Sequence, residues 1–525
     1  MLFSKRLKPG SWRLISIGTT SCSVALFLIG FGCSSVGPAK IGAPPEEMPG
    51  GEPPEGLALF HVPFRIGKTS LPRISVAADG RSFETAGSKP FVPFGVTYFR
   101  AGTGWAPQVW KQFDAEATRR DFALMKELGV NCVRVFLSYG SFYRKPGELD
   151  NAGLAKFDQF LSIAEQAGIY VQPTGPDLWE GQPEWLAADR IADENSLNAL
   201  EHFWRFFATR YRSRNVIFAY ELLNEPEVGW DSETMRAKWR RWLERKYISV
   251  DALRSAWDQG GISFETAAIP AGTNAPGNLV LLDYQEFRES LADDWTARQA
   301  GAIRSVDRNA LVTVGLIQWS VPALLASPKH YSAFRPARQA SFLNFLEIHF
   351  YPFEHGPYEY RDDESETRNL SYLQSVVREA SRPGKPVVLA EFGWYGGGKP
   401  RFDESRHPEA TEDQQARWCR NVIFATRGLA CGWLNWGLYD QPDATDVSEF
   451  TGLLTSEGRV KAWGKVFREL GAELEHARFQ DSRPGHEPAL DWAACVTDTH
   501  AGTAFREKYL QTYLQPATPS GTKQP

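Results

Sequence analysis

The chain has 525 residues, of which 42% are hydrophobic and 13% aromatic, and this is enough apolar material for a large buried core. Its 58 basic and 63 acidic side chains nearly balance, giving a net charge of −5. No strongly basic face is therefore expected, and we predict that the folded body binds neither nucleic acid nor an anionic membrane surface.

The N-terminus has the order of an export signal, because a basic start precedes an apolar run over residues 14–32. The run ends at Gly32-Cys33-Ser34, which resembles a bacterial lipoprotein cleavage site with Cys33 as the lipidated residue. Gly30 stands where such sites usually have an aliphatic residue. Residues 1–33 are thus predicted to be a targeting segment. Lipidation, simple secretion and an uncleaved anchor stay open, and each predicts an extracytoplasmic protein that meets the membrane only through this segment.

Residues 34–56 are rich in proline, glycine and glutamate. Such a segment buries too little apolar surface to fold, so we expect a disordered tether. The folded body is predicted over residues 57–480, followed by a C-terminal extension over residues 481–525.

From about residue 90, short apolar segments typical of strands alternate with longer amphipathic segments typical of helices. The expected strands cover residues 91–99, 131–137, 170–175, 216–224, 311–316, 345–351, 386–392 and 431–438. The expected helices cover residues 114–128, 156–167, 196–212, 283–306, 370–380 and 411–427. Alternating strands and helices give parallel strands, and eight units close a cylinder, so the predicted fold is α/β, a (β/α)8 TIM barrel.

Two features interrupt this regular pattern. The interval between the fourth and fifth expected strands is about twice as long as the others, and its excess, about 228–300, contains Trp239, Trp242, Trp257 and Trp295 on helix-like segments. We therefore predict a helical insertion after strand four, on the rim of the barrel. Upstream, Asp79-Gly80 separates two strand-like stretches, which indicates an N-terminal β-hairpin placed to close the bottom of the barrel.

Two glutamates fall at the carboxyl ends of expected strands. Glu225 follows the fourth strand and Glu391 lies near the end of the seventh. Barrels hold their active sites at this face, so the two carboxyl groups should confront one another across its mouth. Such a pair is what glycosidic cleavage requires, since one carboxyl group protonates the leaving oxygen and the other attacks or directs water. The 18 tryptophans and 17 tyrosines agree with a sugar ligand, although most of them are expected in the core.

The sequences around these glutamates, Asn-Glu-Pro at Glu225 and Glu-Phe-Gly at Glu391, resemble the catalytic motifs of glycoside hydrolase family 5 and its clan of retaining barrel enzymes. The resemblance extends over residues 85–470, roughly. It implies that Glu225 is the acid/base and that Glu391 is the nucleophile.

The resemblance also gives supporting roles to other strand-end residues. It implies that Arg134 pairs with Glu391 and keeps it ionised, as an adjacent opposite charge does. It further implies that Tyr351 donates to Glu391, and that His349 orients Glu225 and contacts the substrate.

Among the remaining substrate-binding residues, the resemblance implies that Asn224 bonds the sugar 2-hydroxyl and that Trp436 forms the floor of the sugar site. The segment after the third strand departs from the family, because the usual histidine is absent. Asp177 or Trp179 is expected to take over its contact. The insertion resembles that of family 42 β-galactosidases in the same clan.

Other polar candidates have plainer interpretations. Glu221 and Glu347 lie deeper on the same strands and are expected to be structural, with Glu221 in a core ion pair. The six cysteines fit neither a metal site nor a disulfide framework. A bridge between Cys419 and Cys431 stays open.

The sequence thus predicts a monomeric, metal-free and cofactor-free retaining glycosidase that acts on β-linked glucan or mannan, as an endo-β-1,4-glucanase or β-mannanase does. Two alternatives stay open. One is an exo-acting β-galactosidase or β-mannosidase in which the insertion walls one end of the cleft. The other is a sugar-binding barrel without catalysis, since barrels of this kind host many functions.

Overall fold

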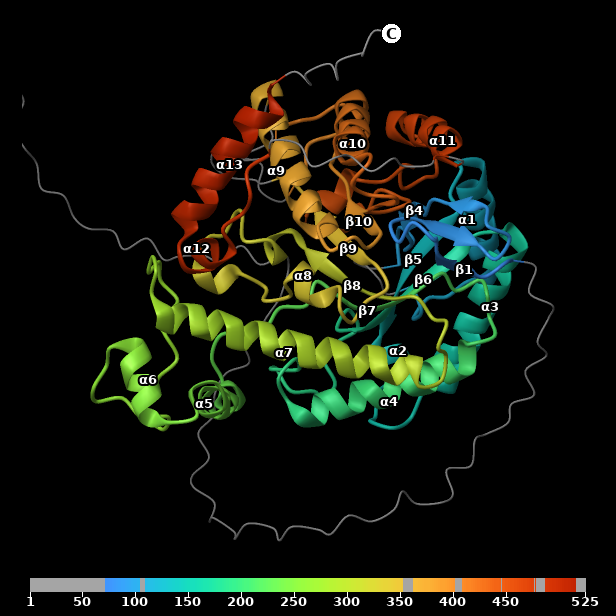
Figure 1. Cartoon of the computed structure of the whole chain (residues 1–525). Helices are drawn as coiled ribbons and strands as arrows, with labels where there is room; N and C mark the ends of the chain where they lie inside the picture. The colour runs from blue at the N-terminus through green and yellow to red at the C-terminus, as the bar shows by residue number, and fades with distance from the viewer. Residues whose placement is uncertain are drawn as a thin grey trace, which may run out of the picture. The chain divides into compact units, whose positions relative to one another are not determined.

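The computed structural model describes residues 71–103, 109–352, 362–401, 408–444, 446–475, 477 and 487–515. Parallel strands close into a barrel in chain order (Figure 1). They are β4 (Phe94–Thr97), β5 (Cys132–Ser138), β6 (Tyr170–Asp177), β7 (Tyr220–Asn224), β8 (Val312–Ile317), β9 (Leu346–Phe350), β10 (Val387–Phe392) and β11 (Trp433–Asn435). β11 pairs with β4 and completes the circle. The predicted (β/α)8 barrel and its expected strands are confirmed.

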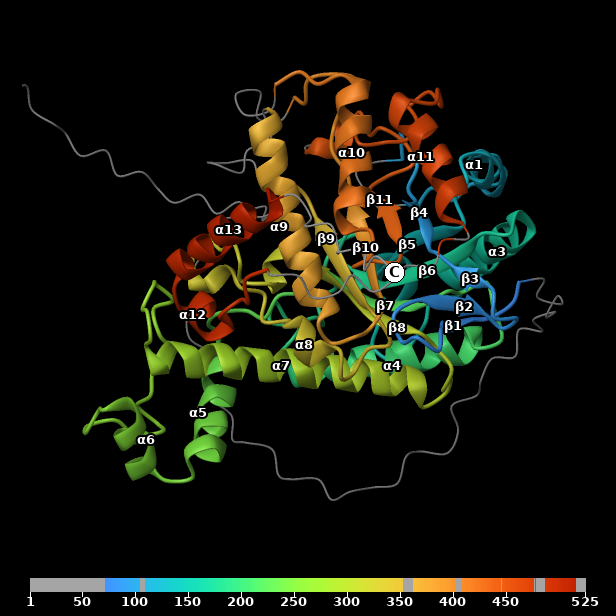
Figure 2. The ribbon, with the colours of Figure 1, turned by 45° about the horizontal axis from the view of Figure 1, so that its top comes forward.

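Helices surround this barrel (Figures 1 and 2). They are α1 (Ala115–Glu127), α2 (Tyr139–Phe142), α3 (Asn151–Ala167), α4 (Glu194–Tyr211), α7 (Leu279–Arg304), α8 (Pro336–Gln339), α9 (Asp363–Ser381), α10 (Glu412–Thr426) and α11 (Ala462–Leu474). Their starts follow from the sequence, because Asp114, Asp150 and Asp193 cap α1, α3 and α4 by accepting bonds from the first free backbone N–H groups. α3 ends at Gly168, whose φ of 76° supplies the left-handed cap.

β5 shows how a strand divides its side chains between two environments. Val133 and Val135 point outward into the apolar layer under the helices. Cys132, Arg134 and Phe136 point inward, at the bottom, the middle and the mouth of the barrel respectively. This two-residue alternation is the ordinary geometry of a strand, and it places polar inward residues in a layer below the mouth.

A small antiparallel sheet covers the amino-terminal end of the barrel. It consists of β1 (Ile74–Val76), β2 (Phe83–Thr85) and β3 (Pro90–Phe91). The Phe83 ring meets Phe218 and Phe345 edge-on, with centroids 5.1 Å apart in both pairs. Phe218 and Phe345 precede β7 and β9, so the sheet packs against the bottom of the barrel. The predicted hairpin is confirmed. The stretch 91–99, predicted as one barrel strand, is divided, because Phe91 belongs to β3 of this sheet and the barrel strand β4 begins at Phe94.

The insertion after strand four contains α5 (Glu233–Tyr247) and α6 (Val250–Trp257). Trp239 is buried there against Trp242, Trp257, Tyr284 and Phe287. Both helices lie beside the N-terminal half of α7, on the outside of the barrel (Figures 1 and 2). The predicted insertion after strand four is therefore present as helices that pack on α7.

Trp295, which the sequence assigned to the insertion, lies farther along α7. Its ring packs on Phe334, and this part of α7 lies against α4. α7 is thus the barrel helix of its unit, lengthened at its N-terminus by the turns that carry α5 and α6.

The C-terminal extension contains α12 (Trp492–Thr497) and α13 (Thr499–Tyr513). Arg378 of α9 donates to the Tyr509 hydroxyl at 3.0 Å, and Arg506 donates to the Ala323 carbonyl at 2.7 Å. These bonds hold α13 against the body of the barrel.

The predicted targeting segment 1–33 with Cys33, and the tether 34–56, lie outside the described residues. Within the described ranges, no helix combines the length and the apolar composition needed to cross a membrane. Cys419 and Cys431 are both buried free thiols, so the bridge left open by the sequence is not formed.

Candidate active site

Polar side chains from several strands converge at the carboxyl-terminal mouth of the barrel. β7 breaks its pairing with β8 between Glu221 and Asn224, and the next residue, Glu225, donates its backbone N–H to the Gly315 carbonyl at 2.8 Å. Glu225 has a φ of 43°, in the left-handed region. This conformation costs a non-glycine residue about 1 kcal/mol, and such strain is typical of functional positions. It turns the Glu225 side chain out of the strand at the mouth.

The carboxyl groups of Glu225 and Glu391 meet around His349. The His349 Nδ1 atom lies 3.1 Å from Oε1 of Glu225 and 3.6 Å from Oε2 of Glu391. The nearest ligand atoms of the three side chains all lie within 4.8 Å of one another. The Glu225 side chain is 18% exposed and that of Glu391 is 7% exposed, so both side chains are partly open to solvent.

The surroundings of Glu391 both favour and oppose its ionisation. Burial raises its pKa, whereas the Arg134 charge and the hydrogen bond from Tyr351 lower it. The Arg134 guanidinium donates to Glu391 at 2.9 Å, and the Tyr351 hydroxyl donates to it at 2.8 Å. These donors are what a carboxylate nucleophile in a buried site needs.

The Arg134 guanidinium has more hydrogen-bond partners than the sequence predicted. Its Nε and Nη2 atoms donate to Glu221 at 2.6 and 2.7 Å, and Nη2 also donates to Oδ1 of Asn224 at 2.6 Å. Only Nη1 serves Glu391. Glu221 therefore forms the core ion pair expected of it, and the stabilisation of Glu391 by Arg134 is partial.

Glu225 has the surroundings of a proton donor. Burial raises its pKa to about 8; Arg134 opposes this, and the charges of Glu227 and Asp177 reinforce it. Burial lowers the pKa of His349 to about 4, so the imidazole is neutral near pH 7. The contact between His349 and Glu225 is thus a hydrogen bond rather than an ion pair. A neutral carboxyl group beside an ionisable one is the arrangement of acid and nucleophile in glycoside hydrolysis.

Comparison with known proteins agrees with this geometry. The family model described as Cellulase (glycosyl hydrolase family 5) matches residues 85–441, more than half of the chain. The chain belongs to glycosyl hydrolase family 5. The matched region runs from β2 to the loop after β11 and contains every barrel strand and both glutamates.

Among curated relatives, the β-galactosidase YesZ of Bacillus licheniformis is 25% identical over 231 residues, which cover 39% of this chain and 34% of the relative. The chain thus matches about a third of the length of that relative.

Two solved structures illustrate the likeness of the fold. The exo-β-1,4-mannosidase Op5Man5 from Opitutaceae bacterium strain TAV5 has a TM-score of 0.55 at 21% identity, covering 76% of this chain and 62% of that one. The β-galactosidase of the haloarchaeon Halorubrum lacusprofundi has a TM-score of 0.57 at 17% identity, covering 73% and 58%. At such low identity these structures show the shared barrel.

Trp436 and Trp179 border the family 5 site through aromatic contacts. Both rings meet Phe136 edge-on, with centroid distances of 6.1 Å for Trp436 and 5.7 Å for Trp179. The Trp436 Nε1 atom donates to the Ser448 hydroxyl at 2.7 Å, and its side chain is almost fully buried. The two tryptophans therefore belong to one aromatic wall at the mouth, and their contacts with sugar stay predictions.

Asp177 lies at the end of β6, level with Ser138 on β5. One of its oxygens accepts from the Leu178 backbone at 2.7 Å and lies 3.9 Å from the Arg190 guanidinium. Burial raises the pKa of Asp177, and its charge in turn raises that of Glu225. Asp177 thus faces the same site as Glu225, as a substitute for the missing histidine would.

The sequence did not single out Gln318 and Trp319, which follow β8. The Gln318 side chain accepts from the Tyr351 backbone N–H at 2.8 Å, and the Trp319 indole N–H donates to Glu227. These bonds join the ends of β7, β8 and β9. A polar and an aromatic residue directly after the fifth expected strand could have been found by the criterion that selected Glu225.

Proposed function

We propose that the protein hydrolyses β-glycosidic bonds with retention of anomeric configuration. The observation that carries the proposal is the proximity of Glu225 and Glu391, whose nearest ligand atoms lie within 4.8 Å of each other. Retaining enzymes hold their two carboxyl groups about 5 Å apart, whereas inverting enzymes leave about 6.5–9.5 Å for a water molecule. The raised pKa of Glu225 supports the same assignment, because the acid must be protonated when the substrate binds.

The reaction would proceed in two displacements. Glu391 attacks the anomeric carbon while Glu225 transfers its proton to the leaving oxygen, so that the glycosidic C–O bond breaks and a glycosyl ester forms. Glu225, now a carboxylate, removes a proton from water as the water oxygen attacks the same carbon. The ester bond to Glu391 breaks, and both carboxyl groups return to their starting states. Asn224 would bond the sugar 2-hydroxyl, where contacts strengthen in the transition state.

For the substrate, we propose a terminal β-mannosyl unit of an oligosaccharide, released by exo action. The support comes from two structural neighbours, an exo-β-1,4-mannosidase and a family 5 structure from Streptomyces cattleya in complex with Manβ1-4GlcNAc. A β-galactoside is the second candidate, because the curated relative YesZ carries that name. Endo-cleavage of β-glucan or mannan, which the sequence first suggested, is the third.

A substrate panel followed by proton NMR tests both parts of the proposal. Aryl β-mannoside, β-galactoside, β-glucoside and β-xyloside would be compared with soluble β-glucan, mannan and xylan. We expect fastest turnover of the β-mannoside, no fall in polymer viscosity, and a β-anomer as the first product. A first product with the α-configuration would contradict retention, and a rapid loss of viscosity would replace exo with endo action.

We also propose, from the N-terminal sequence, that the protein is an extracytoplasmic lipoprotein anchored through Cys33 and monomeric in its folded part. Cys33→Ala should move the protein from the membrane fraction to the soluble fraction of cells. Retention of the variant in membranes would instead favour an uncleaved anchor.

A further inference from the structure

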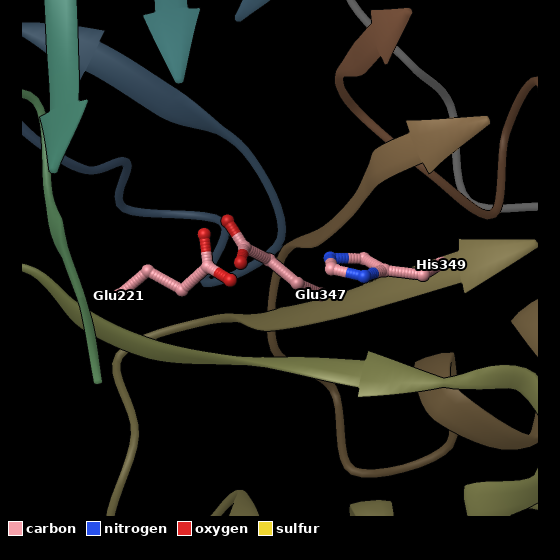
Figure 3. Close-up of side chains that lie close together, drawn as sticks. All are labelled: Glu221, Glu347 and His349. Carbon is pink, nitrogen blue, oxygen red and sulfur yellow. The ribbon is translucent and has the colours of Figure 1, made fainter. Parts of the chain in front are cut away.

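A second layer of polar side chains lies below the carboxyl pair, inside the barrel. It comprises Arg134 on β5, Gln172 on β6, Glu221 on β7 and Glu347 on β9, and all four are completely buried. The carboxyl groups of Glu221 and Glu347 face each other, with the His349 ring beside them (Figure 3). Two ionised carboxylates this close to each other, in an interior without water, would repel each other strongly. The charge of each carboxyl group therefore has to follow from its own hydrogen-bond partners.

Glu221 has all the donors that a carboxylate requires. It accepts from Arg134 through both oxygens, from the Thr174 hydroxyl at 2.8 Å and from the Gln172 amide at 3.0 Å. The positive guanidinium pairs directly with it at 2.6 Å. Glu221 is therefore the ionised member of the facing pair.

Glu347 has far fewer donors. Its Oε1 accepts from the same Gln172 amide at 2.7 Å, but its Oε2 has no donor among the described residues. The Arg134 nitrogens are already engaged by Glu221, Asn224 and Glu391. A buried oxygen without a donor is costly if it belongs to a carboxylate, and it is satisfied if it carries a proton and donates.

We propose that Glu347 is a protonated carboxylic acid that donates to Glu221, and that this acid–carboxylate pair is a positioning device for the nucleophile. Because this pair fixes the position of Glu221, it determines how the Arg134 guanidinium shares its hydrogen bonds between Glu221 and Glu391. The inference rests on the proposed function only for its consequence on turnover. The location of the proton depends on the hydrogen bonds alone.

The groups that face Glu347 agree with this assignment. From β5 come Arg134 and the Cys132 thiol, and from β7 comes the Glu221 carboxyl group. Burial raises the pKa of Glu347 well above its ordinary value, and the adjacent Glu221 charge raises it further. Burial alone would also raise the pKa of Glu221, but Arg134 lowers it below its ordinary value. When Glu347 is neutral, the Arg134 guanidinium interacts with two carboxylates, Glu221 and Glu391, instead of three.

Gly315 on β8 lets this layer close. A Cβ at Gly315 would overlap Oε1 of Glu221 and would lie 2.9 Å from Nε2 of His349. A side chain at this position would therefore displace Glu221, which the proposal requires to stay in contact with Glu347.

A metal ion is the alternative occupant, because Glu221, Glu347 and His349 have ligand atoms within 4.8 Å of one another. Against it, both Glu221 oxygens are bound to the Arg134 guanidinium, so a divalent cation would lie beside a buried positive charge with no anion added. A proton satisfies Glu347 without that repulsion.

Paired variants test the proposal through activity. Glu347→Leu removes the donor and should lower kcat/KM by about tenfold or more, whereas Glu347→Gln supplies a neutral donor and should recover to within about threefold of wild type. Glu221→Gln leaves Glu391 as the one carboxylate paired with Arg134, so the acid limb of the kcat/KM profile should move to lower pH. If Glu347→Gln is as impaired as Glu347→Leu, or if Glu221→Gln leaves the acid limb in place, the proposal is wrong.

Neutron diffraction of the wild-type protein tests the proton directly and depends neither on a variant folding nor on a substrate being known. We expect a deuterium on Oε2 of Glu347 and none on Glu221. A deuterium on Glu221, none on either residue, or a metal ion between them would overturn the proposal. Failure of the glycosidase assignment would leave this measurement and its outcome unchanged.

Discussion

The pKa of Glu225 gives a quantitative prediction for the alkaline side of the activity profile. Because burial and the charges of Glu227 and Asp177 raise that pKa to about 8, the proton needed by the leaving group is lost just above neutrality. At pH 9 about one-tenth of the molecules keep the proton, and at pH 10 about one-hundredth. The value of kcat/KM for a poor leaving group should therefore fall about tenfold per pH unit above pH 8.

The assay compares two aryl glycosides of the same sugar, one with a phenol and one with a 2,4-dinitrophenol leaving group. The dinitrophenolate leaves without protonation, so its alkaline limb should be absent, while the phenyl glycoside shows the full limb. kcat/KM is the correct quantity because it reports the first displacement, in which Glu225 acts as the acid. Glu225→Gln should lose the limb for the phenyl glycoside as well.

Glu227→Gln supplies a matched control outside the carboxyl pair. It removes one of the charges that raise the pKa of Glu225, so the alkaline limb for the phenyl glycoside should move to lower pH. The reasoning fails if both leaving groups give the same limb, or if the limb survives in Glu225→Gln.

Three further predictions concern the nucleophile, its support and the insertion. Glu391→Ala should lower kcat by at least about 1,000-fold, and added azide should restore turnover with an α-glycosyl azide as product; a β-azide would exclude Glu391 as the nucleophile. Tyr351→Phe removes a bond to an ionised carboxylate worth about 1.5–3 kcal/mol, so kcat/KM should fall about 10- to 100-fold, and the acid limb should move to higher pH because Tyr351 lowers the pKa of Glu391. Trp239→Ala should destabilise the α5–α7 packing by about 3–5 kcal/mol, seen as a lower first melting transition in calorimetry, with kcat/KM unchanged; an unchanged thermogram would contradict the packing.

The barrel could be predicted from the sequence because each strand is a short apolar run bounded by cap residues and glycines. Strand ends were less predictable. The eighth strand was expected over residues 431–438, but β11 covers only Trp433–Asn435. Gly437, with a φ of 118°, leaves the sheet there, and the Asn435 side chain turns to bond the Gly437 carbonyl at 2.9 Å. Such side-chain to backbone bonds depend on tertiary packing, which a local pattern does not contain.

The residues of the candidate site could be proposed from the sequence because each one lies near the end of a strand. The contacts that these residues make with one another could not be predicted. Arg134 donates to both Glu221 and Glu391. These three residues come from β5, β7 and β10, so their contact depends on the shape of the closed barrel. The same holds for Glu347, because the Gln172 amide on β6 donates to both Glu347 and Glu221. Sequence patterns indicate on which face of a strand a residue lies. They do not indicate which charged side chains it contacts there.

The central claim is that Glu391 bonds covalently to the sugar while Glu225 supplies the proton. A 2-deoxy-2-fluoro glycosyl fluoride of the preferred sugar slows the second displacement and traps the intermediate, and peptide mass spectrometry then locates the added mass. The account predicts one added sugar per chain, on the peptide that contains Glu391. A label on Glu225, or full turnover with inverted product and no label, would contradict it.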